Sequence, residues 1–271
     1  MDMNVEDYRV TPGDPAAIAD RDPNSHEGIP DKATGKDLLK VERKRIRKLQ
    51  ERLYAESAQS LLVVFQATDT GGKDGTIKKV FRGVNQQGVR VHSFKTPTPE
   101  ELAHDFFWRI HQWTPRDGDI AVFNRSHYED VLIGRVRNLV EKDVWSARYE
   151  QINDFERIVA SNGTRILKFF LHISKDEQKE RLQARLDEPE KHWKFNKDDL
   201  AERELWDDYQ RAYEDAITKC STDVAPWYVI PANRKWYRNV VIARIIADEL
   251  EKMNPQFPPE EPGLEDIVIP D

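Results

Sequence analysis

Hydrophobic residues recur along the chain in two spacings that predict alternating strands and helices. Short, nearly continuous apolar runs, typical of buried strands, cover residues 61–66, 88–94, 119–123, 165–173 and 227–230. Apolar residues at helical spacing mark residues 32–57, 99–112, 145–161, 176–187, 198–219 and 234–253. Strands that alternate with helices predict an α/β fold, with a five-stranded parallel sheet that is covered on both faces.

The two ends of the chain lack this pattern. Residues 1–31 show little periodicity and several Pro and Gly, which predicts an extended or partly ordered arm. Residues 254–271 are Pro-rich and predict a tail that wraps the surface or is loose. One domain is therefore expected over residues 32–253.

Composition adds limits on the class of protein. The 271 residues are 38% hydrophobic and 34% charged, which indicates a folded protein with a charged surface. The one cysteine, Cys220, excludes an internal disulfide framework and a cysteine-based zinc site. No apolar run approaches the roughly 18 residues of a membrane span, and the N-terminus is polar, so we expect no membrane partner and a cytoplasmic location.

Charge is unevenly distributed. The net charge is −7, yet basic residues gather at residues 36–52 and 175–197. An anionic ligand must therefore be held by local clusters rather than by the overall field. The basic helix at residues 36–52 could suit nucleic acid, but no basic strand interleaved with aromatic residues supports it, and no nucleic-acid partner is expected.

The segment ATDTGGKDG at residues 67–75 lies between a predicted strand and a predicted helix, as in a phosphate-binding P-loop. Its glycines let successive backbone N–H groups face one anion, and Lys73 supplies an ammonium for the transferring phosphoryl group. The predicted phosphate-binding residues here are Thr70, Gly71, Gly72, Gly75 and Thr76. The alternative is a glycine-rich turn that binds no ligand.

The loop departs from the pattern GxxxxGK[ST] at both ends. Ala67 replaces the first Gly, and Asp74 replaces the Ser or Thr that usually contacts Mg²⁺. Carboxylates at Asp69 and Asp74 would repel phosphate. A divalent metal must therefore lie between these carboxylates and the phosphate, or one of the two carboxylates acts as a base. An ATP-dependent nucleoside monophosphate kinase of the thymidylate or adenylate type, the alternative function, should have Ser or Thr after the lysine.

A second motif, NRSHYED, follows the strand at residues 119–123 and should lie beside the first strand and its loop. Arg125 can bind phosphoryl oxygens through its forked guanidinium. Asn124, His127 and Glu129 offer hydrogen bonds to a nucleotide or to metal-bound water. The alternative is helix capping beside a solvent-facing acidic pair.

A third segment places Arg181 and Arg185 four residues apart on one helix face, followed by Lys191 and Lys194. Two guanidiniums on one face can bind a phosphate chain. We expect a helical lid at about residues 175–215. The alternative is a solvated charged helix, since acidic residues interleave.

Four segments together resemble the family-2 polyphosphate kinases: ATDTGGKDGTIKKVF, FNRSHYEDVLIGRV, LKFFLHISKDEQKERLQARLDEPEKHWKF and APWYVIPANRKWYRN. The resemblance covers about residues 35–250. It implies a three-layer α/β/α P-loop kinase fold with a helical lid. It also implies Mg²⁺, with Mn²⁺ as a substitute, reversible phosphate transfer from polyphosphate to AMP and ADP that makes ADP and ATP, and a homodimer or homotetramer.

The resemblance also implies roles for individual residues. Asp69 would bind Mg²⁺, Lys73 would hold the transferring phosphoryl group, and Asp74 would serve as a metal partner or base. Arg125 and Arg185 would neutralise charge in the transition state.

Two further implications concern the substrates. Arg181, Lys191 and Lys194 would track the polyphosphate chain. Members that prefer ADP often begin the second motif with Asp-Arg-Ser, whereas Asn124 begins it here. The neutral amide, with His127 nearby, resembles the branch that accepts both AMP and ADP.

Overall fold

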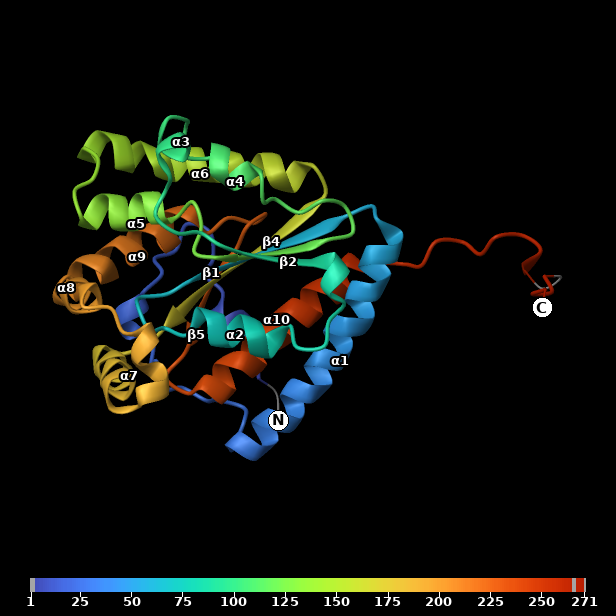
Figure 1. Ribbon diagram of the computed structural model, residues 1–271, viewed down its shortest axis with the longest axis horizontal. Coiled ribbons are helices and arrows are strands. Elements are labelled where there is room, and N and C mark those ends of the chain that lie inside the picture. Colours follow the sequence, from blue (N-terminus) through green and yellow to red (C-terminus); the bar gives the residue numbers. More distant parts are fainter. Residues whose placement is uncertain (1–2, 265–266, 271) are drawn as a thin grey trace.

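The computed structural model describes residues 3–264 and 267–270, which fold around one sheet (Figure 1). All strand pairs are parallel, and the strand order is β2-β3-β1-β4-β5. The strands are β1 (Ser60–Gln66), β2 (Val89–Ser93), β3 (Ile120–Asn124), β4 (Thr164–His172) and β5 (Trp227–Pro231). The predicted five-stranded parallel sheet is confirmed, and the strand before the glycine-rich loop lies at its centre.

Helices cover both faces of the sheet and make three layers (Figure 1). One face carries α1 (Lys32–Glu56), α2 (Lys73–Val80) and α10 (Lys235–Met253). The other face carries α5 (Glu129–Val136), α6 (Lys142–Ser161) and α9 (Trp206–Cys220). Because both faces are covered, every residue of β1 and β3 is buried.

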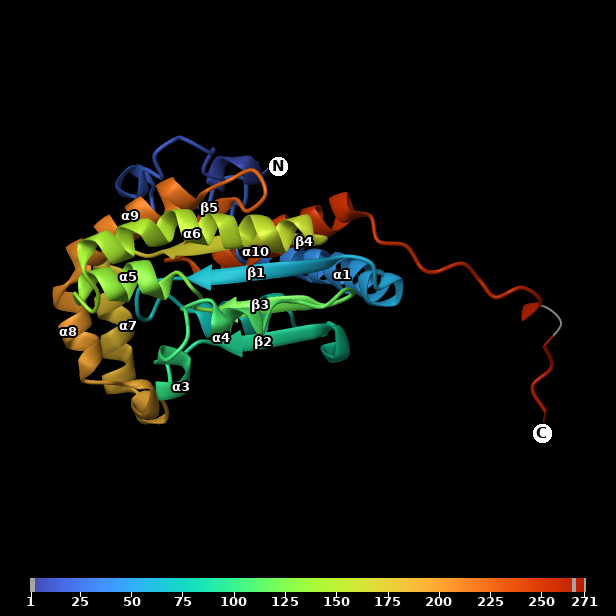
Figure 2. The ribbon, with the colours of Figure 1, turned by 90° about the horizontal axis from the view of Figure 1, so that it is seen from above.

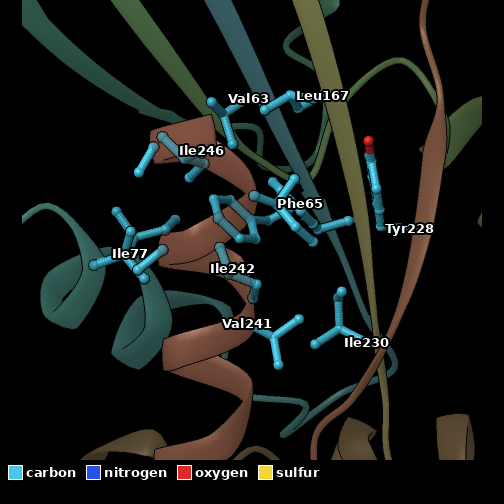
Figure 3. Packing of buried hydrophobic residues seen from close by; sticks show 14 of the residues in the cluster. Val63, Phe65, Ile77, Leu167, Tyr228, Ile230, Val241, Ile242 and Ile246 are labelled. Carbon is cyan, nitrogen blue, oxygen red and sulfur yellow. The ribbon is translucent and has the colours of Figure 1, made fainter. Parts of the chain in front are cut away.

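The larger part of the core lies between the sheet and α10 (Figure 3). Val63 and Phe65 of β1 pack in one cluster with Ile242 and Ile246 of α10, and Ile77 of α2 lies beside them. Each such side chain stabilises the fold by roughly 1.5–3 kcal/mol on leaving water. This packing fixes α2, and therefore the loop that precedes it, against the central strand.

The first part of the segment between β4 and β5 lies at the carboxyl ends of the strands (Figure 2). It contains α7 (Lys175–Asp187), the 3-10 helix η4 (Pro189–Lys194) and α8 (Asp198–Glu204), and we call residues 175–204 the lid segment. The prediction of one helix over residues 198–219 is wrong. Leu205, with φ −88° and ψ 16°, separates α8 from α9.

Two other elements also differ from the prediction. Residues 99–112 form two single-turn helices, α3 (Pro99–Leu102) and α4 (Trp108–His111), rather than one helix. The side chain of Asp105 accepts the backbone N–H of Phe107 over 2.9 Å, a local turn that competes with a continuous helix. The sequence pattern did not predict α5 at all, because its eight residues are too few for a clear period.

The N-terminal arm is more ordered than predicted. It contains the 3-10 helices η1 (Val5–Tyr8) and η2 (Ile18–Asp20). A further 3-10 helix, η3 (Gln86–Gly88), lies outside the arm and precedes β2. The backbone N–H of Val10 donates to the carbonyl of Trp227 in β5 over 2.9 Å. The hydroxyls of Tyr8 and Tyr237 are hydrogen-bonded at 2.5 Å. These partners are distant in sequence, so no local pattern predicts them.

The C-terminal tail leaves the body of the molecule after α10 (Figures 1 and 2). Asn254 ends that helix in the left-handed conformation, with φ 49°. Residues 265–266 and 271 of the predicted tail lie outside the described residues. Among the described residues, no helix combines the length and the apolar composition that a membrane span needs.

Candidate active site

The glycine-rich loop at residues 67–72 requires glycine at two positions. A Cβ atom at Gly71 would lie 2.4 Å from the Cβ of Ala67, and one at Gly72 would lie 2.5 Å from Nη1 of Arg238. Gly72 also has φ 94°, a left-handed conformation that favours glycine. The backbone can therefore turn tightly enough to aim several N–H groups at one anion.

Lys73 begins α2, and its ammonium group lies against the loop. Nζ donates to the carbonyl of Ala67 over 3.1 Å. Burial lowers the pKa of Lys73 and the nearby Arg125 guanidinium lowers it further, whereas three carboxylates oppose the shift: Asp69, Glu129 and Asp74. Because little water screens this ammonium, it would interact strongly with an anion that enters the loop.

Pairing of β3 with β1 brings the second motif to the loop, as predicted. Asn124 lies opposite Phe65 in the sheet, and its Nδ2 donates to Oδ1 of Asp74 over 2.6 Å. Arg125 follows in the left-handed conformation with φ 63°, which costs about 1–3 kcal/mol for a residue other than glycine. Its Nη2 donates to Oδ1 of Asp69 over 3.3 Å. The strained turn therefore aims the guanidinium at the loop.

These groups line one side of an open cleft of about 880 Å³. The lid segment and the start of α10 line the opposite side. The cationic side chains that line the whole cleft are Lys73, Lys95, Arg125, Arg181, Arg185, Lys191, Lys194, Lys235 and Arg238. Fewer carboxylates lie among them, namely Asp69, Asp74, Glu177, Glu180 and Asp199. In a chain with net charge −7, this local excess of cations suits a polyanion.

A smaller pocket of about 270 Å³ adjoins the cleft and shares Asp69, Arg125 and Asp199 with it. Its walls combine apolar, aromatic and acidic side chains, including Leu132, Ile133, Trp206, Tyr209, Tyr213, Glu129 and Glu202. The buried hydroxyl of Thr68 also lines it and has no hydrogen-bond partner within the described residues. A pocket that combines apolar and aromatic walls with convergent polar groups suits a small organic ligand.

The structure brings most of the predicted site residues into these two pockets. The cleft is lined by Asp69, Thr70, Gly71, Gly72, Lys73, Asp74, Gly75, Asn124, Arg125, Arg181, Arg185, Lys191 and Lys194. Glu129 lines the smaller pocket, and its carboxylate is the main cause that raises the pKa of Arg125. Three predicted roles nevertheless need correction.

Arg181 supports the loop instead of tracking a phosphate chain. Its Nη1 donates to the carbonyls of Thr70 and Gly71 at 3.0 and 3.1 Å. Its Nη2 donates to the carbonyls of Ala232 and Asn233 at 2.7 and 3.2 Å. Its Nε donates to Oε1 of Glu177, one helical turn earlier. Because every nitrogen of this buried guanidinium has a protein partner, the predicted contact with polyphosphate is wrong.

His127 and Thr76 are the other two corrections. His127 is fully buried behind the second motif, where Nε2 is hydrogen-bonded to Oε1 of Glu156 at 3.2 Å beside the buried Lys168. Thr76 is also buried, and its hydroxyl donates to the carbonyl of Gly72 over 2.9 Å. Neither residue lines the cleft or the smaller pocket, so their predicted nucleotide and phosphate contacts are wrong.

Three cations of the cleft were not predicted as site residues. Arg238 donates from Nη1 to the carbonyl of Gly71 over 3.0 Å, and burial, with the charge of Arg181, lowers its pKa to about 9. Lys235 and Lys95 line the cleft from the start of α10 and the end of β2. No spacing marks these residues, although two of them lie within the fourth segment of the family resemblance.

Arg185 faces the cleft from the lid segment. Its Nη1 donates to Oδ2 of Asp199 and to the carbonyl of Lys194, both at 2.9 Å. Within the described part of the chain, Nε and Nη2 have no hydrogen-bond partner, so they remain available to a phosphate. Lys191 forms an ion pair with Glu188 at 2.5 Å and also lines the cleft.

Asp69 and Asp74 form a donor set that fits Mg²⁺. Each carboxylate uses Oδ1 in a hydrogen bond to the second motif, which leaves Oδ2 for other partners. No group of three or more His, Cys, Asp or Glu among the described residues is arranged to hold an ion. Mg²⁺ commonly binds through one or two carboxylates and completes its shell with substrate phosphates and water.

A central P-loop strand, a second cationic motif on the neighbouring strand and a lid segment define the class of P-loop phosphotransferases. A family model described as Polyphosphate kinase 2 matches residues 30–258. The crystal structure of polyphosphate kinase 2 from Arthrobacter aurescens TC1 superposes with a TM-score of 0.93 and 45% identity. It covers 96% of this chain and 93% of that one.

Two curated relatives are similar over most of their length. The AMP/ADP-polyphosphate phosphotransferase of Meiothermus ruber is 54% identical over 266 residues, which cover 98% of this chain and 100% of that protein. The ADP-polyphosphate phosphotransferase of Rhodopseudomonas palustris is 44% identical over 239 residues, 84% of this chain and 83% of that protein. The chain belongs to the polyphosphate kinase 2 family.

Proposed function

We propose that this protein transfers phosphoryl groups from inorganic polyphosphate to AMP and ADP, making ADP and ATP, and catalyses the reverse reactions. The observation that carries the proposal is the junction of the two pockets at Asp69 and Arg125. A polyanion in the cationic cleft and a nucleotide in the smaller pocket would bring their phosphates together there. The names of the two curated relatives agree with this pair of substrates.

The chemistry requires one P–O bond to form and another to break. An oxygen of the acceptor phosphate attacks the terminal phosphorus of polyphosphate, and the shortened chain leaves with the bonding electrons. Charge spreads over the oxygens of the transferring group in such a transition state. Lys73 and Arg125 are placed to neutralise this charge, and Arg185 would join them from the lid segment. One preorganised contact of this kind typically contributes about 10²–10³ in rate.

We assign Mg²⁺, with Mn²⁺ as a substitute, to Asp69 and Asp74. When bound, the ion would offset the repulsion between carboxylates and phosphates and neutralise charge on the transferring group. The protein orients both carboxylates, because Arg125 donates to Asp69 and Asn124 donates to Asp74. The metal ligands are therefore held by the same motif that faces the acceptor.

We assign the smaller pocket to the nucleoside. The aromatic side chains of Tyr209 and Tyr213 offer apolar surface for a base, and the hydroxyl of Thr68 offers a hydrogen bond. Its volume of about 270 Å³ is close to the lower end of ordinary ligand pockets, roughly 300 Å³. An acceptor in this pocket would extend its phosphate toward Arg125.

A mixture of the protein, Mg²⁺, AMP and long-chain polyphosphate without ATP tests the proposal. ADP and then ATP should appear. A parallel mixture with ATP as the only phosphate donor tests the alternative, an ATP-dependent nucleoside monophosphate kinase. If AMP is phosphorylated only when ATP is present, the proposed donor is wrong.

The family resemblance also leads us to propose a homodimer or homotetramer in the cytoplasm. Sedimentation equilibrium measures the mass of the assembly, and cell fractionation measures its location. A monomer at micromolar concentration would contradict the first part.

A further inference from the structure

Five cations on α1, on α2 and in the turn after α2 face solvent outside the cleft, and the site described above does not use them. We call them the basic face: Arg43, Arg47, Lys78, Lys79 and Arg82. All are exposed except Arg43, which is half-buried. None forms an ion pair with a carboxylate within the described part of the chain. Other cations of α1 do, since Lys40 pairs with Asp37 and Arg45 with Glu42.

One side chain of the basic face links the two helices. Nε of Arg43 donates to the carbonyl of Lys79 over 2.5 Å, so this side chain reaches from α1 to α2. Burial lowers the pKa of Arg43, and the charge of Arg82 lowers it further. Arg47 follows Arg43 by one helical turn. Like charges on neighbouring turns destabilise a protein unless an anion compensates them.

The basic face also begins at the edge of the cleft. Gly75 lines the cleft and lies on the exposed side of α2. Lys78 and Lys79 lie one helical turn further along the same side, and Arg82 follows in the turn after α2. At 1.5 Å per residue, α2, which ends at Val80, carries this side about 7.5 Å beyond Gly75. A linear anion that leaves the cleft over the start of α2 would meet these three cations in succession.

We propose that the basic face is an exosite that binds the part of a long polyphosphate chain that extends out of the cleft. The inference rests on the proposed function, because the donor chain must first occupy the cleft. Polyphosphate carries a negative charge on every unit, so a row of unpaired cations that continues from the cleft matches its linear charge. Short oligophosphates would end inside the cleft and would not reach Lys78, Lys79 or Arg82.

The test compares two triple variants in AMP phosphorylation. The first, Lys78→Ala with Lys79→Ala and Arg82→Ala, removes three charges of the basic face. The matched control removes three exposed charges from α6 and α9, on the opposite face of the sheet, by Lys142→Ala, Arg157→Ala and Arg211→Ala. Kinetics are measured with tripolyphosphate and with long-chain polyphosphate.

The basic-face variant should raise KM for long-chain polyphosphate about tenfold, a modest loss for each exposed charge, with kcat unchanged. It should use tripolyphosphate like the wild type, and the control should use both donors like the wild type. The slope of log KM against log salt for the long chain should also fall by about 2 units, roughly 0.7 for each lost contact.

An equal loss with both donors, or no loss with the long chain, would overturn the exosite. Binding measured by fluorescence polarisation adds a second readout with labelled long-chain polyphosphate and labelled single-stranded RNA. If the basic-face variant loses RNA binding but keeps polyphosphate binding, the face serves nucleic acid and the inference is wrong. A wild type that uses neither donor would reject the proposed function, and the exosite with it.

Discussion

Nδ2 of Asn124 lies 2.6 Å from Oδ1 of Asp74 and donates a hydrogen bond to it, which joins the second motif directly to the phosphate loop. Asn124 ends β3, whereas Asp74 belongs to the first turn of α2. A neutral amide therefore orients a carboxylate without adding negative charge beside the phosphates. We propose that this contact makes the choice of acceptor depend on the residue at position 124.

Replacing Asn124 by Asp should reduce activity with AMP more than activity with ADP. Two unit charges ~4 Å apart interact by roughly 4 kcal/mol at an effective dielectric of about 20, before further screening. The added carboxylate would repel Asp74 and the dianionic phosphate of AMP that must approach the reacting centre. The measurement is the ratio of initial rates with AMP and ADP at saturating polyphosphate. Asn124→Ala, which adds no charge, is the control, and an unchanged ratio in Asn124→Asp would refute this role.

Arg181→Lys should lower kcat at least about tenfold, although the charge is retained. A lysine cannot donate to four carbonyls at once, so the loop at Thr70 and Gly71 would lose its support and the transition-state contacts would be displaced. Arg21→Lys is a matched control, because Arg21 also donates to backbone carbonyls but lies in the N-terminal arm. Wild-type turnover in Arg181→Lys would show that the loop does not depend on the hydrogen bonds of the Arg181 guanidinium.

Turnover should require a divalent metal, because Asp69 and Asp74 lie in the cleft beside the proposed phosphate site. Excess chelator should abolish AMP phosphorylation, and added Mg²⁺ should restore it, with Mn²⁺ as a partial replacement. Isothermal titration of Mg²⁺ into wild type and Asp69→Asn, each with tripolyphosphate present, gives a readout that is independent of activity. Full turnover in excess chelator would contradict the assignment of both carboxylates.

His127 should make stability depend on pH. Burial lowers the pKa of His127 in the folded state, so below about pH 6.5 the unfolded chain binds a proton that the folded protein does not. The free energy of unfolding should therefore fall as the pH drops, by about 1.4 kcal/mol per pH unit. His127→Gln keeps a donor toward Glu156 but cannot titrate. Urea unfolding of the wild type and of His127→Gln at pH 7.5 and 5.5 gives the difference between their free energies of unfolding. This difference should change with pH, and a constant difference would contradict a neutral buried histidine.

Much of the fold could be predicted because the relevant signals are local. A run such as residues 61–66 is apolar because its strand is buried on both faces, and the glycines after it reveal the turn. The position of Asn124 beside the loop also followed, since carboxyl ends of parallel strands share one edge. The N-terminal arm could not be predicted in this way, because its order depends on partners such as Trp227.

The individual roles of the site residues were less predictable. Arg181 and Arg185 have the same spacing signal, yet one is buried against carbonyls near Ala232 while the other faces the cleft. The difference arises from the turn after β5, about fifty residues later in the chain. His127 likewise looks like a ligand in its motif, but its ring is directed to a partner on α6. The direction of a side chain depends on tertiary packing, which the spacing of residues along the sequence does not predict.

We propose that Lys73 is required for phosphoryl transfer from polyphosphate, and one measurement tests this most directly. Polyphosphate labelled with ³²P is incubated with unlabelled AMP and Mg²⁺, and label is followed into the β-phosphate of ADP. Wild type should transfer the label, Lys142→Ala should do so equally well, and Lys73→Ala should do so at least ~10²-fold more slowly, for the loss of roughly 3–4 kcal/mol of transition-state stabilisation. Transfer by Lys73→Ala at the wild-type rate would contradict the role of Lys73. No label in ADP with the wild type would contradict polyphosphate as the donor.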